Sequence, residues 1–459
     1  MDYAALEQFL FQQMSQFNSA GVSLALIADD QIIWARGFGL RSIEQSLPAT
    51  TRTIYPVASV SKSFTAAAIL QLAEAGKLSL DDPVEQHLPW FTIKPGGESI
   101  RITHLLSHTS GMAALGSSER IAGALSGARN DFLPLVTYAD VPQFLKGAES
   151  WTVGRPGERY MYSNEGYMLL GCIIQQITGQ PHETVIRDQI FQPLGMANAY
   201  YNRADVEAYD DVASLYQLTA EGKRLALRSP YRELNAHSGI VTNVLDLSRY
   251  VRMYLRGGEL DGARVLQPQS VAAMQTARVA TSNGAENGSR FHYGYGLLNM
   301  PDFFDDTLIG HGGSIGISTS FIGWLTKRKV GVAVLMNGTG IPTEFIGIVA
   351  LTMLAGADPY QLPFVVNDGY YAPLTGTYRT YMNTVEAQVR RQGDFLSVTF
   401  KYDDYRSVTT ALAPDIITRD YCRFYTVAFG SRMNVEFHIR EQGQVDLLYE
   451  RYLLRKARS

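Results

Sequence analysis

The stretch that decides the fold is "VASVSKSFTAAAI", Val57–Ile69, in which three serines and one lysine precede an Ala-rich apolar run. Apolar residues recur at helical spacing over Ser61–Ala75, which predicts a buried helix. In a helix, residues three apart share one face, with Cβ atoms about 5–6 Å apart. Ser59 and Lys62 stand at this spacing, so their side chains can touch.

This pair has the chemistry of a nucleophile and a base. A serine hydroxyl is a poor nucleophile until a base takes its proton, and an amine can take it only when burial lowers the amine's pKa toward the working pH. We therefore predict Ser59 as the nucleophile and Lys62 as its base. Ser61 and Ser63 have no lysine at that spacing. The backbone N–H of Ser59 is also free to stabilise an oxyanion at the helix start. The alternative is a lysine that extends to solvent.

The composition limits the classes of protein. A chain of 459 residues, 46% of them hydrophobic, is longer than one core usually grows, which predicts two domains. The formal net charge is −4 and no run of like charges is longer than Lys327–Lys329, so nucleic acid and acidic membrane surfaces are not expected as partners. Cys172 and Cys422 lie far apart in apolar stretches, so we expect no disulfide framework, no zinc site and no other cofactor.

The N-terminal stretch Met1–Phe17 predicts an amphipathic helix. It carries an acid at its second position and polar residues among its apolar ones, unlike the basic start and continuous apolar run of a signal peptide. The sequence contains no run of about 18 apolar residues, which argues against a membrane span. We therefore expect a cytoplasmic location.

The first 357 residues mix helical and strand patterns. A hairpin is predicted from Val22–Ala28 and Ile32–Phe38, and a largely helical lobe follows over residues 101–254. Further strands are predicted over Tyr293–Met300, Ser318–Leu325 and Lys329–Asn337, with a last helix over Pro342–Leu354. Because strands occur at both ends of this region, we expect an α+β fold in which one antiparallel sheet gathers distant segments.

The composition changes to Pro, Asp and Gly around Gly356–Leu374, as is typical of a domain boundary. Beyond it, short runs of alternating apolar and polar residues are separated by Gly, Asp and Asn turns, which predicts a small antiparallel β-barrel or sandwich. The predicted division is a catalytic domain over residues 1–357, a linker over 358–374 and a β-barrel domain over 375–459.

Two further motifs follow Ser59-x-x-Lys62 in chain order. One is Tyr162-Ser163-Asn164, after a Pro-Gly loop and before a predicted helix, and the other is His311-Gly312-Gly313, in which His311 opens a predicted strand. With this ordered set, Gly21–Leu354 resembles the serine β-lactamase-like hydrolases, in particular the branch of class C β-lactamases, D-aminopeptidases and family VIII carboxylesterases. The resemblance implies a β-lactamase or penicillin-recognising fold, with an antiparallel sheet, flanking helices and a helical lobe.

The resemblance also implies roles for single residues. Ser59 would be acylated, Lys62 would be its partner in proton transfer, and Tyr162 would be the phenolic acid/base beside them. Asn164 would hold Lys62 and the substrate amide. The remaining residues would form the strand edge that binds substrate and, through a backbone N–H, the second oxyanion donor: His311, Gly312, Gly313 and Ser314.

Two other motifs in the sequence point to different chemistry. Gly312–Gly316 matches G-x-S-x-G, but a nucleophile elbow needs a helix after the serine, whereas a strand is predicted here, so Ser314 is not expected to be a nucleophile. His104 and His108 stand four apart, as metal-binding histidines on a helix do, but Leu105 occupies the position of a zincin glutamate. We expect no metal there, and predict His108 to be a hydrogen-bonded turn residue.

The third motif bears on the substrate. In the β-lactamases and D-alanyl carboxypeptidases that the chain resembles, it usually begins with a lysine that helps hold the substrate carboxylate, whereas here it begins with His311. A neutral imidazole loses that attraction. The variant is similar to that of D-aminopeptidases, which bind a free amine. We therefore expect D-aminopeptidase-like hydrolysis of small amides and short peptides with an N-terminal D-residue, and of simple esters. A carboxylesterase or weak β-lactamase, and a catalytically silent binding protein, stay open as alternatives.

The tail is similar to the β-barrel domains appended to some of these enzymes and, more distantly, to the lipocalin-like tail of an archaeal serine peptidase in the same superfamily. Two roles stay open for residues 375–459. They either shape the catalytic cleft or serve as a module for homo-oligomerisation or stability.

Overall fold

The structure is a computed structural model of the whole chain. The residues it describes are 1–117, 137–218, 224–227, 236–284, 290–338, 343–362, 365, 369–392, 395–401, 407–428, 431–440 and 443–457. They form two compact units, Met1–Ala357 and Asp358–Ser459.

A nine-stranded antiparallel sheet organises the first unit. β1, near the start of the chain, pairs with β15, near the end of the unit, so the sheet brings the two ends of the unit together. This confirms the predicted α+β fold with one sheet that gathers distant segments. In spatial order the strands are β10 (Val279–Gly284), β11 (Arg290–Tyr293), β12 (Leu298–Phe303), β13 (Asp306–Ser314), β14 (Thr319–Leu325), β15 (Val330–Met336), β1 (Gly21–Ala28), β2 (Gln31–Ser42) and β3 (Leu47–Pro48).

The central strands are apolar along their whole length because helices cover both faces of the sheet. All residues of β14 and β15 are buried. A Cβ at Gly331 would meet Val251 of α10 (Val244–Leu255), whereas one at Gly323 would meet Leu351 of α12 (Thr343–Leu354). Since Gly323 pairs with Val332, the neighbour of Gly331, these contacts lie on opposite faces of the sheet.

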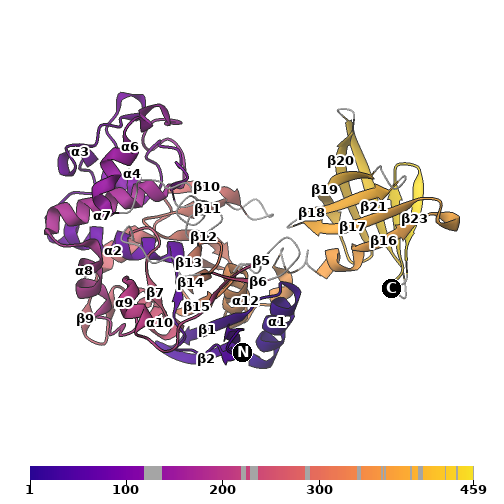
Figure 1. Cartoon of the computed structure of the whole chain (residues 1–459), viewed down its shortest axis with the longest axis horizontal. Helices are drawn as coiled ribbons and strands as arrows, with labels where there is room; N and C mark the ends of the chain where they lie inside the picture. Colours follow the sequence, from indigo (N-terminus) through magenta and orange to yellow (C-terminus); the bar gives the residue numbers. More distant parts are fainter. Residues whose placement is uncertain are drawn as a thin grey trace. The chain divides into compact units, whose positions relative to one another are not determined.

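The remaining helices of the unit form its helical lobe and its N-terminal layer. Figure 1 shows α3, α4, α6 and α7 gathered at one side of this unit, with β1 and β2 at the other. The helices besides α10 and α12 are α1 (Tyr3–Gln16), α2 (Ser61–Glu74), α3 (Val84–His87), α4 (Ile102–Leu106), α6 (Val141–Leu145), α7 (Asn164–Thr178), α8 (His182–Ile186), α9 (Arg203–Glu207) and α11 (Pro268–Gln275). Short strands pair as β4 (Tyr55–Pro56) with β7 (Val241–Thr242), β5 (Leu215–Leu218) with β6 (Arg224–Leu227) and β8 (Glu259–Leu260) with β9 (Ala263–Arg264).

The predicted helix Ser61–Ala75 is α2, and it is buried as expected. Its residues from Ser61 to Leu70 are all buried, and it packs on α7, α8 and α11. The last predicted helix begins at Thr343 in the structure, while Pro342 lies outside the described residues. The N-terminal helix is also present, and Phe11 of α1 packs against Phe38 of β2.

One predicted strand is wrong. Tyr293–Met300 does not run straight, because β11 ends at Tyr293 and β12 begins at Leu298. Gly296 in between has a φ of 70°, and a Cβ there would lie 2.8 Å from the Cβ of Ala66. Glycine adopts this left-handed conformation at no steric cost, so the chain turns here into a hairpin.

The second unit is a closed antiparallel barrel of eight strands, as the alternating pattern of the tail predicted. Each strand pairs with the next one in sequence, and β16 closes the barrel by pairing with β23. The strands are β16 (Gly376–Arg379), β17 (Glu386–Gln392), β18 (Phe395–Lys401), β19 (Ser407–Ile417), β20 (Tyr421–Ala428), β21 (Ser431–Ile439), β22 (Val445–Tyr449) and β23 (Tyr452–Lys456).

Apolar side chains fill the inside of the barrel. Alternate residues of its strands form one buried cluster that includes Val389, Val398, Phe424 and Phe437. Tyr371 and Leu374 belong to the same cluster, although they precede β16. The turn η7 (Ala372–Leu374) therefore contributes to the barrel core.

Candidate active site

Ser59 lies in a single 3₁₀ turn, η1 (Ala58–Val60), which leads directly into α2. The segment before it is bonded on two sides: Val57 N donates to Ile240 O (2.9 Å), and Val57 O accepts from Ser320 Oγ (2.6 Å). Ala58 has a φ of 48°, a left-handed conformation that costs a non-glycine residue roughly 1–3 kcal/mol. The surrounding bonds therefore hold the backbone before Ser59 in a strained shape.

Lys62 is completely buried, and its ammonium group donates three hydrogen bonds. The acceptors are Ser59 Oγ at 3.1 Å, Asn164 Oδ1 at 2.7 Å and the backbone oxygen of His237 at 2.9 Å. The Lys62 nitrogen also lies 4.8 Å from the centroid of the Tyr162 ring. The lysine does not extend to solvent, so the alternative considered for it is wrong. Its burial is compensated by polar partners, as a buried charge requires.

Tyr162 precedes α7 in a closely bonded segment. Ser163 caps the helix by accepting from Gly166 N (3.2 Å), and its own backbone N–H donates to Nδ1 of His108 (3.1 Å). The His108 ring lies 4.2 Å from the Tyr162 ring, centroid to centroid. His108 follows the end of α4, has a φ of 57° and is buried, so it is the hydrogen-bonded turn residue that was predicted.

His311 lies in the middle of β13 and not at its start, which corrects the prediction that it opens the strand. Its Nδ1 lies 2.6 Å from Gly312 O, an acceptor, so Nδ1 carries the proton and Nε2 accepts from Tyr293 Oη (2.9 Å). Burial, together with the charge of Lys62, lowers the pKa of His311 to about 3. The imidazole is therefore neutral at physiological pH.

Gly313 brings β13 against the turn that carries Ser59. A Cβ at this position would lie 2.3 Å from Val57 O and 3.0 Å from Ser59 N, distances that leave no room for a side chain. The glycine therefore allows the strand edge to approach the backbone N–H of Ser59. Ser314 is the last residue of β13, and the next element is the strand β14, so G-x-S-x-G is not a nucleophile elbow here.

A cavity of about 550 Å³ opens beside Ser59. The predicted residues Ser59 and Tyr162 line it, as does the strand segment 311–314, while Lys62 and Asn164 lie behind them and join the site through hydrogen bonds. The structure thus brings together all eight predicted site residues. The described residues that line this cavity are Ser59, Tyr160, Tyr162, Tyr293, Leu298, His311, Gly312, Gly313, Ser314, Thr319, Ser320, Thr343 and Glu344.

Among the residues of this site that were not predicted, three bear on its chemistry. Tyr293 orients His311, the backbone oxygen of His237 receives Lys62, and Glu344 lines the cavity. A backbone carbonyl carries no signal in a sequence. Glu344 stands in the first turn of a helix, where an acid is ordinary, so its pattern gave no indication of a role.

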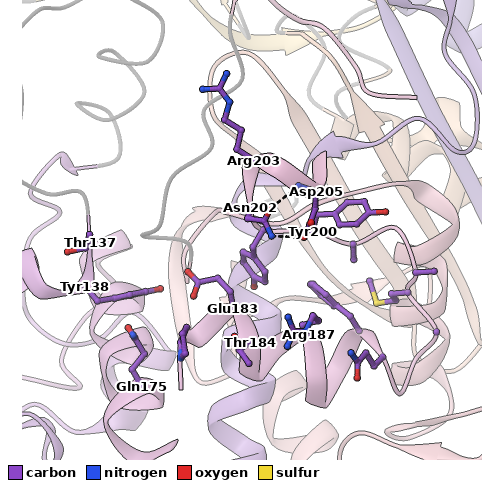
Figure 2. A pocket seen from close by; sticks show the side chains of 18 of the residues that line it. Thr137, Tyr138, Gln175, Glu183, Thr184, Arg187, Tyr200, Asn202, Arg203 and Asp205 are labelled. Atoms are coloured by element: carbon purple, nitrogen blue, oxygen red, sulfur yellow. Dashed lines mark hydrogen bonds between the residues drawn. The ribbon is translucent and has the colours of Figure 1, made fainter. Parts of the chain in front are cut away.

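A larger cavity, of about 1160 Å³, lies away from Ser59 among residues of α7, α8 and α9. Figure 2 shows Glu183, Thr184 and Arg187 on one side of it and Tyr200 and Asn202 on another. No serine or cysteine is among its described lining residues, so it offers no counterpart of Ser59 and Lys62.

His104 and His108 do not share a helix, because α4 ends at Leu106. His104 Nδ1 accepts from Arg101 N (3.1 Å) and His108 Nδ1 from Ser163 N, so both rings are engaged by the backbone. Within the described part of the chain, no three His, Cys, Asp or Glu side chains gather as metal ligands would. Among the same residues, no helix has the length and apolar character needed to cross a membrane.

Comparison with known families agrees with this geometry. Residues 6–356 match the model of the Beta-lactamase family, and residues 359–455 match that of the Pab87 octamerisation domain. The chain therefore belongs to the Beta-lactamase family of serine hydrolases.

Individual relatives extend the comparison. The structure of the octameric penicillin-binding protein homologue from Pyrococcus abyssi is 36% identical, with a TM-score of 0.94, over 99% of this chain and 100% of that one. EstCE1, a hydrolase with promiscuous acyltransferase activity, is 25% identical, with a TM-score of 0.60, over 73% of this chain and 93% of its own. Penicillin-binding protein 4* of Bacillus subtilis is 26% identical over 96% of both chains. Protein flp of Staphylococcus aureus is 27% identical over 69% of this chain, which spans only 59% of that protein.

Proposed function

We propose that the chain is a serine hydrolase that forms an acyl-enzyme at Ser59 and acts on small amides, short peptides and esters, in the manner of a D-aminopeptidase. The observation that carries the proposal is the hydrogen bond from the buried Lys62 ammonium to Ser59 Oγ, at the edge of an open cavity. A nucleophile, a base, a second proton carrier and an oxyanion site are the four parts that acyl transfer needs.

The proposed reaction begins from Lys62 that has lost one proton to solvent and, as a neutral amine, still donates to Asn164 Oδ1 and His237 O. Ser59 Oγ then attacks the substrate carbonyl carbon, and its proton moves to the lone pair of Lys62 Nζ. The developing oxyanion accepts hydrogen bonds from the backbone N–H groups of Ser59 and Ser314. The bond from the carbonyl carbon to the leaving nitrogen or oxygen then breaks. The leaving group takes a proton from Tyr162 Oη, which Lys62 reprotonates. Water attacks the resulting ester by the reverse sequence and releases the acid.

Asn164 and the β13 edge have supporting roles in this proposal. Asn164 Oδ1 holds the Lys62 nitrogen, while the backbone of His311, Gly312 and Gly313 aligns the substrate beside Ser59. The neutral His311 supplies no positive charge for a substrate carboxylate, which supports amides and esters over the carboxylate-bearing substrates of β-lactamases.

Ester hydrolysis without a peptide role is the second candidate. It is favoured by the likeness to EstCE1, which reaches 25% identity over 93% of that chain. Comparing D-alanyl anilides, short-chain nitrophenyl esters and a chromogenic cephalosporin separates the candidates, because all three substrates report on the same nucleophile.

We further propose that copies of this chain assemble into homo-oligomers through the barrel. The match of residues 359–455 to the Pab87 octamerisation domain and the likeness to the octameric Pyrococcus abyssi homologue support this. We also propose a cytoplasmic location, which the buried and unpaired Cys172 and Cys422 support.

The first experiment is intact-mass spectrometry after incubation with a fluorophosphonate and with a p-nitrophenyl ester. The native chain is compared with Ser59→Ala and with Ser314→Ala as the matched serine control. We expect the adduct and the turnover to disappear in Ser59→Ala alone. Labelling that survives in Ser59→Ala and is lost in Ser314→Ala would overturn the mechanism, and a native protein that takes no label would favour the silent binding protein.

A further inference from the structure

Glu344 is the second residue of α12, and its side chain lines the same cavity as Ser59. Its Oε2 lies 3.3 Å from the position that a Cβ on Gly312 would occupy, so the carboxylate faces the substrate-binding segment of β13. Gly312 is adjacent to Gly313, which abuts the backbone of Ser59. The carboxylate is therefore near the nucleophile and beside the strand edge along which a substrate would lie.

An acid in the first turn of a helix is usually explained by the helix dipole. That explanation accounts for an exposed carboxylate or for one bonded to the first backbone N–H groups. In the described residues, however, the Glu344 carboxylate has no hydrogen bond and no ion pair, and burial raises its pKa. Glu344 is only partly buried, so its carboxylate remains open to the cavity, where a bound cation would supply the partner that the described residues do not.

The charged side chains that line the cavity indicate the charge of the ligand that it would bind. Of the described residues that line it, Glu344 is the one acidic or basic side chain besides the neutral His311. The Lys62 ammonium lies behind Ser59 and already donates to three oxygens. The cavity wall therefore presents a negative group and no free positive one to a substrate.

We propose that Glu344 is a specificity-determining residue that binds the protonated amine of the substrate's acyl part. The preferred substrates are then amino-acyl amides, peptides with a free N-terminus and amino-acyl esters, while N-acylated and N-succinylated analogues are poor. The inference rests on the proposed function, because it assumes that the acyl group is transferred to Ser59. A carboxylate and an ammonium form a charge-assisted hydrogen bond, which is about twice as strong as a neutral one.

The test compares the native chain with Glu344→Gln, which keeps the shape and removes the charge. Each protein is assayed with D-alanyl p-nitroanilide, its N-acetyl form and its N-succinyl form, and Glu207→Gln on the exposed surface of α9 is the matched control. We expect the ratio of kcat/KM for the free amine to that for the N-acetyl form to fall roughly 10- to 100-fold in Glu344→Gln alone. The N-succinyl form should be hydrolysed better by Glu344→Gln than by the native chain.

Fluorophosphonate labelling of Ser59 separates the two proposals. If Glu344→Gln is labelled at the native rate and the substrate ratio does not change, the role of Glu344 is wrong and the hydrolase proposal stands. If the native chain is not labelled, the hydrolase proposal itself fails.

A second measurement needs no variant. D-Alaninamide, which carries the ammonium, should inhibit ester turnover by the native chain at least about tenfold better than D-lactamide, its neutral isostere. Equal inhibition by the two compounds would overturn the role of Glu344.

Discussion

Lys62 Nζ donates to Asn164 Oδ1 across 2.7 Å, which joins two residues that stand 102 positions apart in the chain. The bond fixes the direction of the Lys62 ammonium relative to Ser59, since Asn164 is the first residue of α7 and Lys62 lies in the first turn of α2. The packing of α2 on α7 thus sets the geometry of the proposed base.

Removing this bond is expected to slow acylation without unfolding the chain. In Asn164→Ala, Lys62 keeps its bonds to Ser59 and to His237 O but loses the one that orients it from α7. We expect the rate of fluorophosphonate labelling to fall roughly 10- to 100-fold, less than the typical 10²–10⁴-fold for loss of a proton carrier, because Lys62 itself remains in place. Asn202→Ala, at the N-terminal cap of α9, is the control and should label at the native rate.

Two adjacent glycines of β13 are expected to differ sharply when replaced. In Gly313→Ala, the new methyl would meet Val57 O at 2.3 Å, so β13 must move away from Ser59. We expect loss of labelling and a destabilisation of about 1–3 kcal/mol, typical of overpacking. In Gly312→Ala, the nearest atom to the methyl is the flexible end of Glu344 at 3.3 Å, and Ser320 O lies at an ordinary contact distance of 4.0 Å, so labelling should persist. Equal labelling by both variants in the intact-mass assay would contradict the role assigned to Gly313.

Four buried histidines predict a loss of stability in mild acid. Burial lowers the pKa of His182 and of His311 to about 3, and it lowers the pKa of His108 and of His237 well below 6.5. The unfolded chain therefore binds more protons than the folded one below about pH 6.5, so the stability present above that pH is lost toward pH 3. Each histidine contributes a slope of about 1.4 kcal/mol per pH unit. Burial raises the pKa of Asp246 to about 6, so below pH 6 the folded chain binds a proton at Asp246 that the unfolded chain does not. This proton offsets the loss of stability caused by one of the histidines.

Urea unfolding at pH 7.5, 6.5 and 5.5 measures this slope. His182→Gln is the informative variant, because His182 bonds to Thr65 Oγ1 (3.0 Å) and takes no part in the Ser59 site. We expect the pH dependence of the free energy of unfolding to be smaller in the variant by about 1.4 kcal/mol per pH unit, the contribution of one histidine. Labelling by fluorophosphonate should be unchanged. A free energy of unfolding that does not change over this pH range would mean that the buried histidines do not remain neutral.

The outer face of the barrel carries an apolar pair that is expected to contact a second copy. Leu448 of β22 and Leu453 of β23 are directly paired across the two strands, and they are 39% and 46% exposed. Light scattering after size exclusion should give a smaller species for Leu448→Lys with Leu453→Lys than for the native chain, with Ser59 labelling intact. Val408→Lys, at another exposed position on β19, controls for added charge. A native monomer, or a double variant of native size, would contradict assembly through this face.

The local part of the site could be predicted from the sequence, because it depends on short-range geometry. Ser59 and Lys62 are three residues apart, and helical spacing alone predicts their contact. Tyr162, Asn164 and His311 were predicted from the order of motifs and not from any physical rule that relates distant positions. The hairpin at Gly296 was missed because the apolar and aromatic residues around it have the pattern of a continuous strand. The left-handed conformation of one glycine gives no signal against that pattern.

The contributors that were missed depend on tertiary structure. The oxygen of His237 receives Lys62 only because the chain before β7 passes beside α2, and every residue has such an oxygen. That Glu344 lacks a basic neighbour among the described residues becomes visible only when the side chains that line the cavity are known. In the second unit, the alternation of apolar and polar residues predicted the strands. The closure of the barrel depends on the pairing of its first and last strands, in which Tyr378 of β16 lies opposite Lys456 of β23.

The closed barrel restricts how copies of this chain can meet. An open sheet offers a neighbour a row of unpaired backbone groups, which invites strand addition and fibres. Here β16 through β23 each have a partner on both sides, so the barrel has no edge to extend. Recognition between copies must then use outward side chains such as Leu448 and Leu453, which can change without disturbing the backbone pairing. The proposed assembly can therefore change through substitutions of outward side chains while the barrel keeps its fold.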